Sequence, residues 1–152
     1  MSNEQILNEL KDLSLNIQKR KESLSTFLDV SIEDIECLDI VDCAFTVDNE
    51  DYLVLTYEEA REKTEEYIKN SLCYFNTEFI YLHSIFYGKN EDCTDVIKAI
   101  QDKEDSSLIE DIIEDLDSFI EDAICCDGMG NFLASYDSEE HEQGDFLIYR
   151  VN

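Results

Sequence analysis

Basic residues are scarce in this chain of 152 residues. Only 11 Lys and Arg stand against 38 Asp and Glu, which gives a formal net charge of −27. A small soluble domain usually carries a net charge of magnitude about 2–8, so self-repulsion here exceeds what solubility requires. The excess excludes direct binding of nucleic acid through a basic face and disfavours adsorption to an anionic membrane.

Proline and tryptophan are absent, and glycine occurs four times. Loops built on proline and linkers rich in glycine are therefore excluded. None of the six cysteines forms a C-x-x-C pair, and a chain of this length needs no disulfide staples, so we expect free thiols in a reducing cytoplasm. There is no basic-then-apolar start and no apolar run near 18 residues, so the sequence predicts neither secretion nor a membrane span. The predicted location is the cytoplasm, which is that of the host if the chain is phage-encoded.

Apolar residues are nevertheless abundant. They make up 43% of the chain and include eight Tyr and eight Phe, whereas charged disordered chains lack such residues. The charge is also unevenly distributed, because residues 1–30 carry a net −1 and residues 31–152 carry −26. We therefore expect an N-terminal helical arm over residues 1–30 and an acidic folded domain over residues 31–152.

The N-terminal segment has the pattern of one amphipathic helix. Its apolar residues recur at alternating spacings of four and three, as in a heptad seam, with Arg20 at one seam position. Two interpretations are open. The seam pairs with a second copy to form a homodimer, or it packs on the chain's own domain. The dimerisation residues of the first interpretation are Ile6, Leu10, Leu13, Ile17, Leu24 and Phe27.

The remaining residues predict an α+β domain. After a capped helical turn at Ser31, β-type runs are expected at 43–47, 52–55, 131–135 and 146–151, forming two hairpins. About four helices are expected between them, over 56–72, 77–87, 94–100 and 107–126. The economical assembly is a mostly antiparallel four-stranded sheet with helices on one face.

The helix expected over 107–126 sorts its residues by character. At about 100° per residue, Ile109, Ile112, Ile113, Leu116, Phe119, Ile120, Ala123 and Ile124 fill one arc. The opposite arc holds seven acids and no base, although like charges four residues apart destabilise a helix. Those acids are Glu110, Asp111, Glu114, Asp115, Asp117, Glu121 and Asp122.

This acidic arc indicates a surface that imitates nucleic acid. In an uninterrupted helix, the offsets 110, 114, 117 and 121 place carboxylates about 5–6 Å apart along the axis, comparable to successive phosphates on one strand. The loop over 136–145 adds the acids Glu139, Glu140, Glu142 and Asp145. The alternatives are an ordinary solvated face and the generally acidic surface of a halophilic protein.

Other chemistry has weaker support in the sequence. The 137–145 loop lacks the spacing of a calcium loop, and the Cys and His residues lack zinc spacing. At most, a weak divalent-ion site is compatible with the carboxylates. No phosphate-binding, dinucleotide-binding or hydrolase motif is present. We predict no cofactor, no metal and no catalytic residues. A small enzyme that uses the turn at 127–137 remains an alternative.

Several stretches resemble a known group of proteins. They are Asp51-Tyr-Leu-Val-Leu-Thr-Tyr-Glu-Glu-Ala60, Tyr67-Ile68, Phe75-Asn76, Asp127-Gly-Met-Gly-Asn-Phe-Leu-Ala-Ser-Tyr-Asp137 and Phe146-Leu-Ile-Tyr-Arg-Val-Asn152. This chain resembles small acidic proteins of phages and other mobile elements over roughly residues 51–152. In the group's D-G-x-G-x-F-L pattern, Met129 and Asn131 stand where a basic residue and a His are usual.

The resemblance implies a context. Small, very acidic phage proteins are often counter-defence factors that imitate DNA to block restriction enzymes or CRISPR effectors, and the analogy is one of kind. The resulting hypothesis is a non-enzymatic inhibitor that occupies the basic groove of a nuclease or another nucleic-acid-binding protein. The main alternative is a phage accessory or assembly protein whose acidity only maintains solubility.

Overall fold

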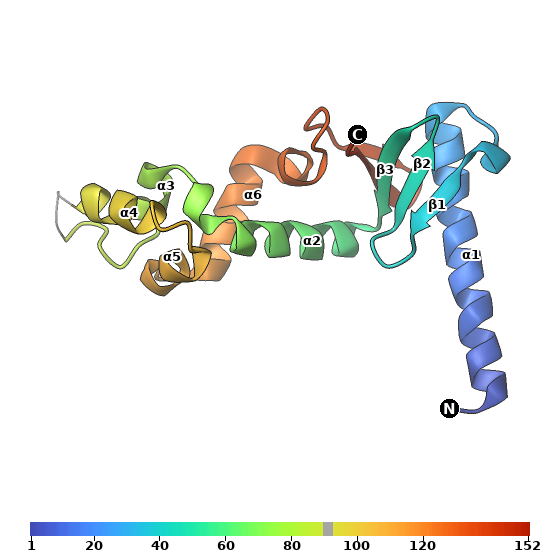
Figure 1. The fold of residues 1–152 in the computed structure, drawn as a ribbon, viewed down its shortest axis with the longest axis horizontal. Helices are drawn as coiled ribbons and strands as arrows, with labels where there is room; N and C mark the ends of the chain where they lie inside the picture. Colours follow the sequence, from blue (N-terminus) through green and yellow to red (C-terminus); the bar gives the residue numbers. More distant parts are fainter. Residues whose placement is uncertain (90–92) are drawn as a thin grey trace. The chain divides into compact units, whose positions relative to one another are not determined.

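The computed structural model describes residues 1–89 and 93–152, which form an α+β fold with two compact units (Figure 1). Unit 1 comprises Met1–Arg61 and Met129–Asn152, and unit 2 comprises Glu62–Gly128. This division differs from the one expected at residue 30. The physical reason is that the second half of the N-terminal helix belongs to the core of unit 1 rather than to a separate arm.

The N-terminal helix is confirmed as α1, Asn3–Leu28. It begins with a capping box, because the Ser2 hydroxyl accepts from the Gln5 backbone N–H while the Gln5 side chain accepts from Ser2 N. It ends at Asp29, whose backbone is left-handed with φ 55°. In its second half, Leu24 is fully buried, while in its first half every residue through Asn16 is exposed.

Unit 1 contains an antiparallel sheet of five described strands, one more than predicted. The order is β1-β2-β3-β5-β4, with all neighbours antiparallel. The bounds are β1 Glu36–Asp39, β2 Ala44–Val47, β3 Glu50–Leu55, β4 His141–Gln143 and β5 Phe146–Arg150. Two strands, β1 and β4, were not predicted, because they are short and rich in polar residues.

The first predicted hairpin is confirmed as β2 and β3, in the register Phe45 opposite Tyr52. Its turn is shorter than the four residues expected. Asp48 and Asn49 make the turn alone, with φ of 51° and 67°. Two positive φ values in succession match the twist of a tight hairpin, and Asp and Asn tolerate this conformation better than most residues.

The strand predicted at 131–135 is wrong. Helix α6, Leu116–Leu133, occupies residues 131–133 after a kink at Gly128. The backbone N–H of Ala134 donates to the Gly130 carbonyl at 2.9 Å, as in a helical turn. The strand β5 therefore pairs with β4 instead, with Gln143 opposite Phe146.

The core of unit 1 lies between α1 and one face of the sheet. Leu24 of α1 packs with alternate residues of the strands, which share one face because side chains alternate along a strand. The buried cluster consists of Leu24, Ile35, Phe45, Val47, Tyr52, Val54 and Ile148. Figure 1 shows α1 running along the strands at its C-terminal end and extending past them toward its N-terminus.

Arg20 anchors α1 in this core, although the sequence placed it at a seam position. It is 3% exposed, and its guanidinium donates two hydrogen bonds to Glu59, at 2.7 and 2.8 Å. It also donates to the Val54 carbonyl at 2.6 Å and lies 5.0 Å from the ring centre of Phe146. The fold tolerates this buried charge because the guanidinium is hydrogen-bonded and paired with a carboxylate.

In unit 2 the regular elements among the described residues are helices, joined by turns and one isolated β-bridge. Helix α2, Tyr57–Asn70, begins with the predicted capping box, in which Thr56 and Glu59 exchange hydrogen bonds. It is followed by α3 Thr77–Leu82, α4 Cys93–Gln101, α5 Ser106–Ile112 and α6. The predicted helix over 77–87 ends early, because Ser84 leaves the helix to form a β-bridge with Ile113.

Phe119 is the centre of the packing in unit 2. It is fully buried, and its ring lies 5.1 Å from Phe75, 4.8 Å from Phe79 and 5.2 Å from His83 between ring centres. Edge-on contacts of this kind add to the hydrophobic gain. Within the described residues, no helix combines the length and the apolar character that a membrane crossing requires.

Candidate functional site

The acidic stretch 110–122 does not form a single helix. The chain leaves α5 at Ile113, whose backbone is extended at φ −80° and ψ 127°, and α6 begins at Leu116. The break is fixed by backbone pairing, in which Ile85 N donates to the Ile112 carbonyl and Glu114 N donates to the His83 carbonyl, both at 2.9 Å. The prediction of one uninterrupted helix is therefore wrong.

The correction changes the arrangement of the predicted acids. Glu110 and Asp111 lie on α5, Glu114 and Asp115 lie in the break, and the other three lie on α6. A regular row at one helical repeat is absent, so spacing that imitates successive phosphates has no support. Asp115 accepts from the Ser118 backbone N–H at 3.1 Å and caps the start of α6.

The sorting of apolar and acidic residues persists despite the break. The apolar side is buried at Ile109, Ile112, Ile113, Phe119, Ile120 and Ala123. All seven predicted acids are exposed. Some of them also have structural contacts, since Asp115 caps α6 and Asp122 lies 3.1 Å from Nε2 of His83. We call residues 110–122 the α5–α6 acidic surface.

The acids of the 136–145 loop belong to unit 1, and all four are exposed. One of them, Glu140, accepts a hydrogen bond of 2.6 Å from the hydroxyl of Tyr149. Burial, and then this bond, raises the pKa of Tyr149 far above its usual range. Glu142 lies in β4, so part of the predicted loop is a strand.

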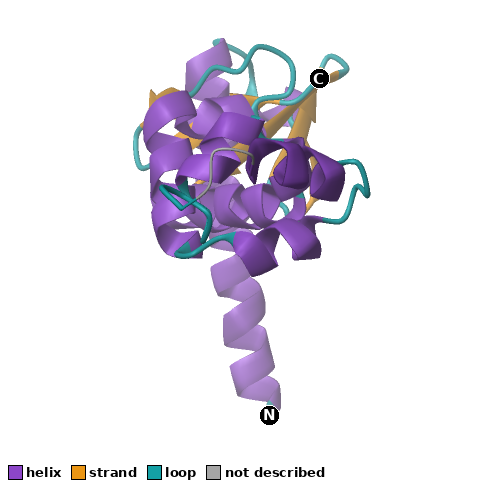
Figure 2. Cartoon of the chain, turned by 90° about the vertical axis from the view of Figure 1, so that its left-hand side faces the viewer, coloured by secondary structure: helices purple, strands orange, loops and turns teal. Residues whose placement is uncertain are grey.

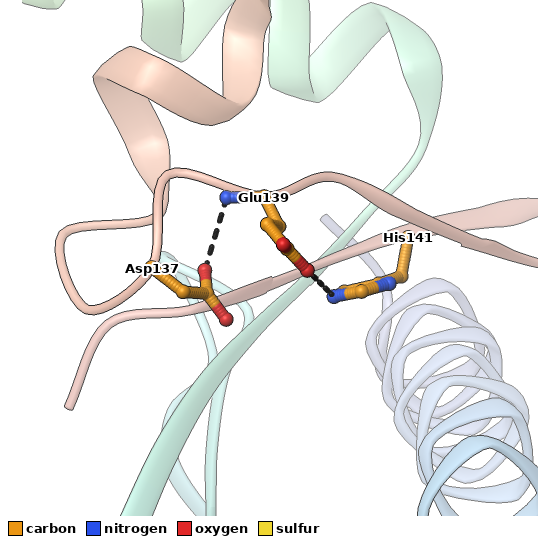
Figure 3. Close-up of side chains that lie close together, drawn as sticks. All are labelled: Asp137, Glu139 and His141. Atoms are coloured by element: carbon orange, nitrogen blue, oxygen red, sulfur yellow. Dashed lines mark hydrogen bonds and ion pairs between the residues drawn. The ribbon is translucent and has the colours of Figure 1, made fainter.

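Asp137, Glu139 and His141 form a cluster that the sequence reasoning missed (Figure 3). One ligand atom of each lies within 4.8 Å of the others, and Glu139 Oε2 is 3.5 Å from His141 Nε2. The Glu139 backbone N–H donates to Asp137 at 3.0 Å, and the His141 ring lies 4.9 Å from that of Phe27. The signal was the alternation D-x-E-x-H, which is neither calcium-loop nor zinc-finger spacing.

Two carboxylates and one imidazole are ligands that zinc or manganese accepts. Among residues 1–89 and 93–152, this is the one group of three such side chains close enough to hold an ion. Zinc needs ligand atoms about 2.0–2.2 Å from the ion, so the three side chains would have to approach one another further. Exposed carboxylates are common in so acidic a chain, and the cluster by itself assigns no function.

Gly128 and Gly130, both within α6, are each required for a different structural reason. Gly128 has φ 76° inside α6, a conformation that favours glycine. A Cβ on Gly130 would lie 2.7 Å from the Ser138 carbonyl oxygen. Gly130 thus allows the 138–140 backbone to approach closely, which positions the loop that carries Glu139 and Glu140.

Negative charge is shared between the two units. Unit 1 has 20 acids and 6 bases, for a net −14, and unit 2 has 18 acids and 5 bases, for a net −13. Between Lys103 and Arg150 there is no Lys or Arg at all. The α5–α6 acidic surface and the acids of the 136–145 loop therefore both lie in a stretch without any Lys or Arg.

Comparison with protein-family models, with curated proteins and with solved structures found no match. The resemblance to small acidic phage proteins therefore stays a prediction.

Proposed function

We propose that this chain is a non-enzymatic acidic inhibitor that occupies the basic groove of a nucleic-acid-binding protein. The partner class is a host defence nuclease, of the restriction or CRISPR type. Its acidic surface would occupy the site of the nucleic acid because that surface is negatively charged and rigid. It would need no cofactor.

The observation that carries the proposal is the sorting of charge on the α5–α6 acidic surface. Seven exposed acids lie over a buried apolar core in a stretch without any basic residue. A protein that needs acidity only for solubility gains nothing by separating its acids from its bases. Mixed signs would also stabilise the helices through pairs four residues apart.

The buried core supports the proposal through rigidity. Phe119 and its aromatic neighbours hold α6 in place, and the bridge between Ser84 and Ile113 holds the break between α5 and α6. Because these charges are already held in place, little conformational entropy is lost when a partner binds. Complementary charge also raises the association rate and makes binding weaken with salt.

A charge-reversal experiment tests the proposal. The test variant carries Glu110→Lys, Asp111→Lys, Glu114→Lys and Asp117→Lys, which leave the cap at Asp115 and the pair at Asp122 intact. The matched control reverses four exposed acids of unit 2 outside this surface. It carries Glu62→Lys, Glu66→Lys, Glu78→Lys and Asp95→Lys. Four reversals change the net charge from −27 to −19 in both variants.

The readout is cleavage of plasmid DNA by purified restriction and RNA-guided nucleases, together with capture from host lysate at low and high salt. We expect the wild-type chain and the control variant to inhibit cleavage and to capture nucleic-acid-binding proteins at low salt only. The test variant should lose both properties while keeping its circular dichroism spectrum. Equal inhibition or capture by the two variants would contradict the proposal, because their net charges are the same.

A further inference from the structure

No described residue of unit 1 covers the first half of α1. Residues 3–16 are exposed along the whole length of this half, and they include five large apolar side chains, Ile6, Leu7, Leu10, Leu13 and Leu15. Figure 2 shows the N-terminal turns of α1 standing clear of the strands. A helix of about 14 residues without tertiary contacts is marginal in water, so a partner on this half would stabilise it.

The exposed apolar residues continue a stripe that is already used for packing. Leu24 and Arg20 of this stripe are buried in unit 1, and Ile17 and Phe27 pack against the same core. At about 100° per residue, Ile6, Leu10 and Leu13 lie on the same side of the helix. Thus the C-terminal part of the predicted seam packs inside unit 1 of the same chain, whereas the N-terminal part stays exposed.

Charge opposes a second copy less on this free half than at the acidic surfaces. Residues 1–16 hold three acids and one base, for a net −2, in a chain of −27. Two identical acidic chains repel each other wherever their acidic surfaces meet. The free half of α1 carries little of the charge, so close approach costs less there than at the acidic surfaces. Its heptad spacing is complementary to itself.

A hollow on this helix provides a place for a side chain of the second copy. Leu10, Leu13 and Ile17 line an open hollow of about 240 Å³ together with Ser14, Gln18 and Lys21. Helices that pair through heptads insert side chains into such holes.

We infer that the chain is a homodimer held by the N-terminal half of α1, with Ile6, Leu10 and Leu13 at the contact. The inference goes beyond the proposed function and does not depend on it. It narrows the contact to the half of the seam that the core of unit 1 leaves exposed. Each assembled dimer would carry two copies of every acidic surface.

The test compares two single substitutions in the full chain, Leu10→Lys and Leu15→Lys. Leu10 and Leu15 are 57% and 55% exposed, but Leu15 lies on the opposite side of the helix from the stripe. Both changes add one positive charge, and neither removes a buried group. The measurement is molar mass by sedimentation equilibrium, at 50 and 500 mM NaCl, with helicity followed by circular dichroism.

We expect a dimer for the wild-type chain and for Leu15→Lys, and dimerisation more than about tenfold weaker for Leu10→Lys. Higher salt should strengthen the dimer, because it screens the repulsion between two chains of −27. A monomeric wild-type chain at both salt concentrations would overturn the inference, and so would equal weakening by both substitutions. Salt weakens nucleic-acid mimicry but strengthens this dimer, so failure of one proposal is distinguishable from failure of the other.

Discussion

Arg20 and Glu59 show how a single ion pair connects distant parts of unit 1. The Arg20 guanidinium lies in the core, while the Glu59 side chain is 37% exposed. Burial alone would raise the pKa of Glu59. The hydrogen bonds from Arg20 and from the Thr56 backbone, together with the charge of Arg20, outweigh burial and lower it. The ionised form of Glu59 therefore stabilises the fold.

The substitution Glu59→Gln tests this pair. We expect it to lower the free energy of unfolding at pH 7 by about 1–2 kcal/mol, a loss limited by water around the exposed part of the carboxylate. Because the pKa of Glu59 is lower in the folded state, its contribution is present above its ordinary value of 4.5. This contribution to stability is lost as the pH falls through the lower pKa that Glu59 has in the folded state. Urea unfolding between pH 3 and 7 measures the difference.

Glu58→Gln is the matched control, since Glu58 is an exposed neighbour in the same first turn of α2. It should show no comparable loss and no such pH dependence. If Glu59→Gln and Glu58→Gln behave alike at every pH, the ion pair is not a significant source of stability.

At the scale of elements, backbone conformation decides where strands and helices end. The β2–β3 turn depends on positive φ at Asp48 and Asn49. The α5–α6 break depends on hydrogen bonds to residues 83–85, which are remote in the sequence. The turn was visible as a polar break between two β-type runs, but the helix break was not, because the apolar periodicity continues through it.

Two substitutions at Asn49 test the turn. Asn49→Val should destabilise the fold by about 1–2 kcal/mol, because a β-branched residue is strained at positive φ. Asn49→Gly removes the same side chain but accepts this conformation freely, so it should be neutral or slightly stabilising. The measurement is the urea midpoint of each variant. Equal losses in the two variants would mean that side-chain contacts, and not backbone conformation, matter at this position.

At the scale of the whole molecule, charge opposes folding. A net −27 is divided almost equally between the two units, so neither unit escapes repulsion. The buried cores of the units must offset this cost. Screening by salt should therefore stabilise the chain.

Thermal unfolding in NaCl tests the cost of repulsion. We expect the melting temperature to rise by several degrees between 50 and 500 mM NaCl, as the Debye length shortens from over 10 Å to under 5 Å. The variant with four reversals on the α5–α6 acidic surface should show a smaller rise, since its net charge is −19. A melting temperature that does not change with salt would indicate that repulsion between the acids contributes little.

The sequence by itself determined the class of the fold, the long N-terminal helix, the β2–β3 hairpin and the exposure of the acids opposite an apolar stripe. These features depend on periodicity, caps and turn residues, which act over a few positions. Only the tertiary structure decided that Arg20 and Leu24 belong to the core, that 110–122 is broken, and that Asp137, Glu139 and His141 lie together. Each of these depends on partners remote in the sequence, or on a loop path set by close packing against Gly130, and no local pattern records them.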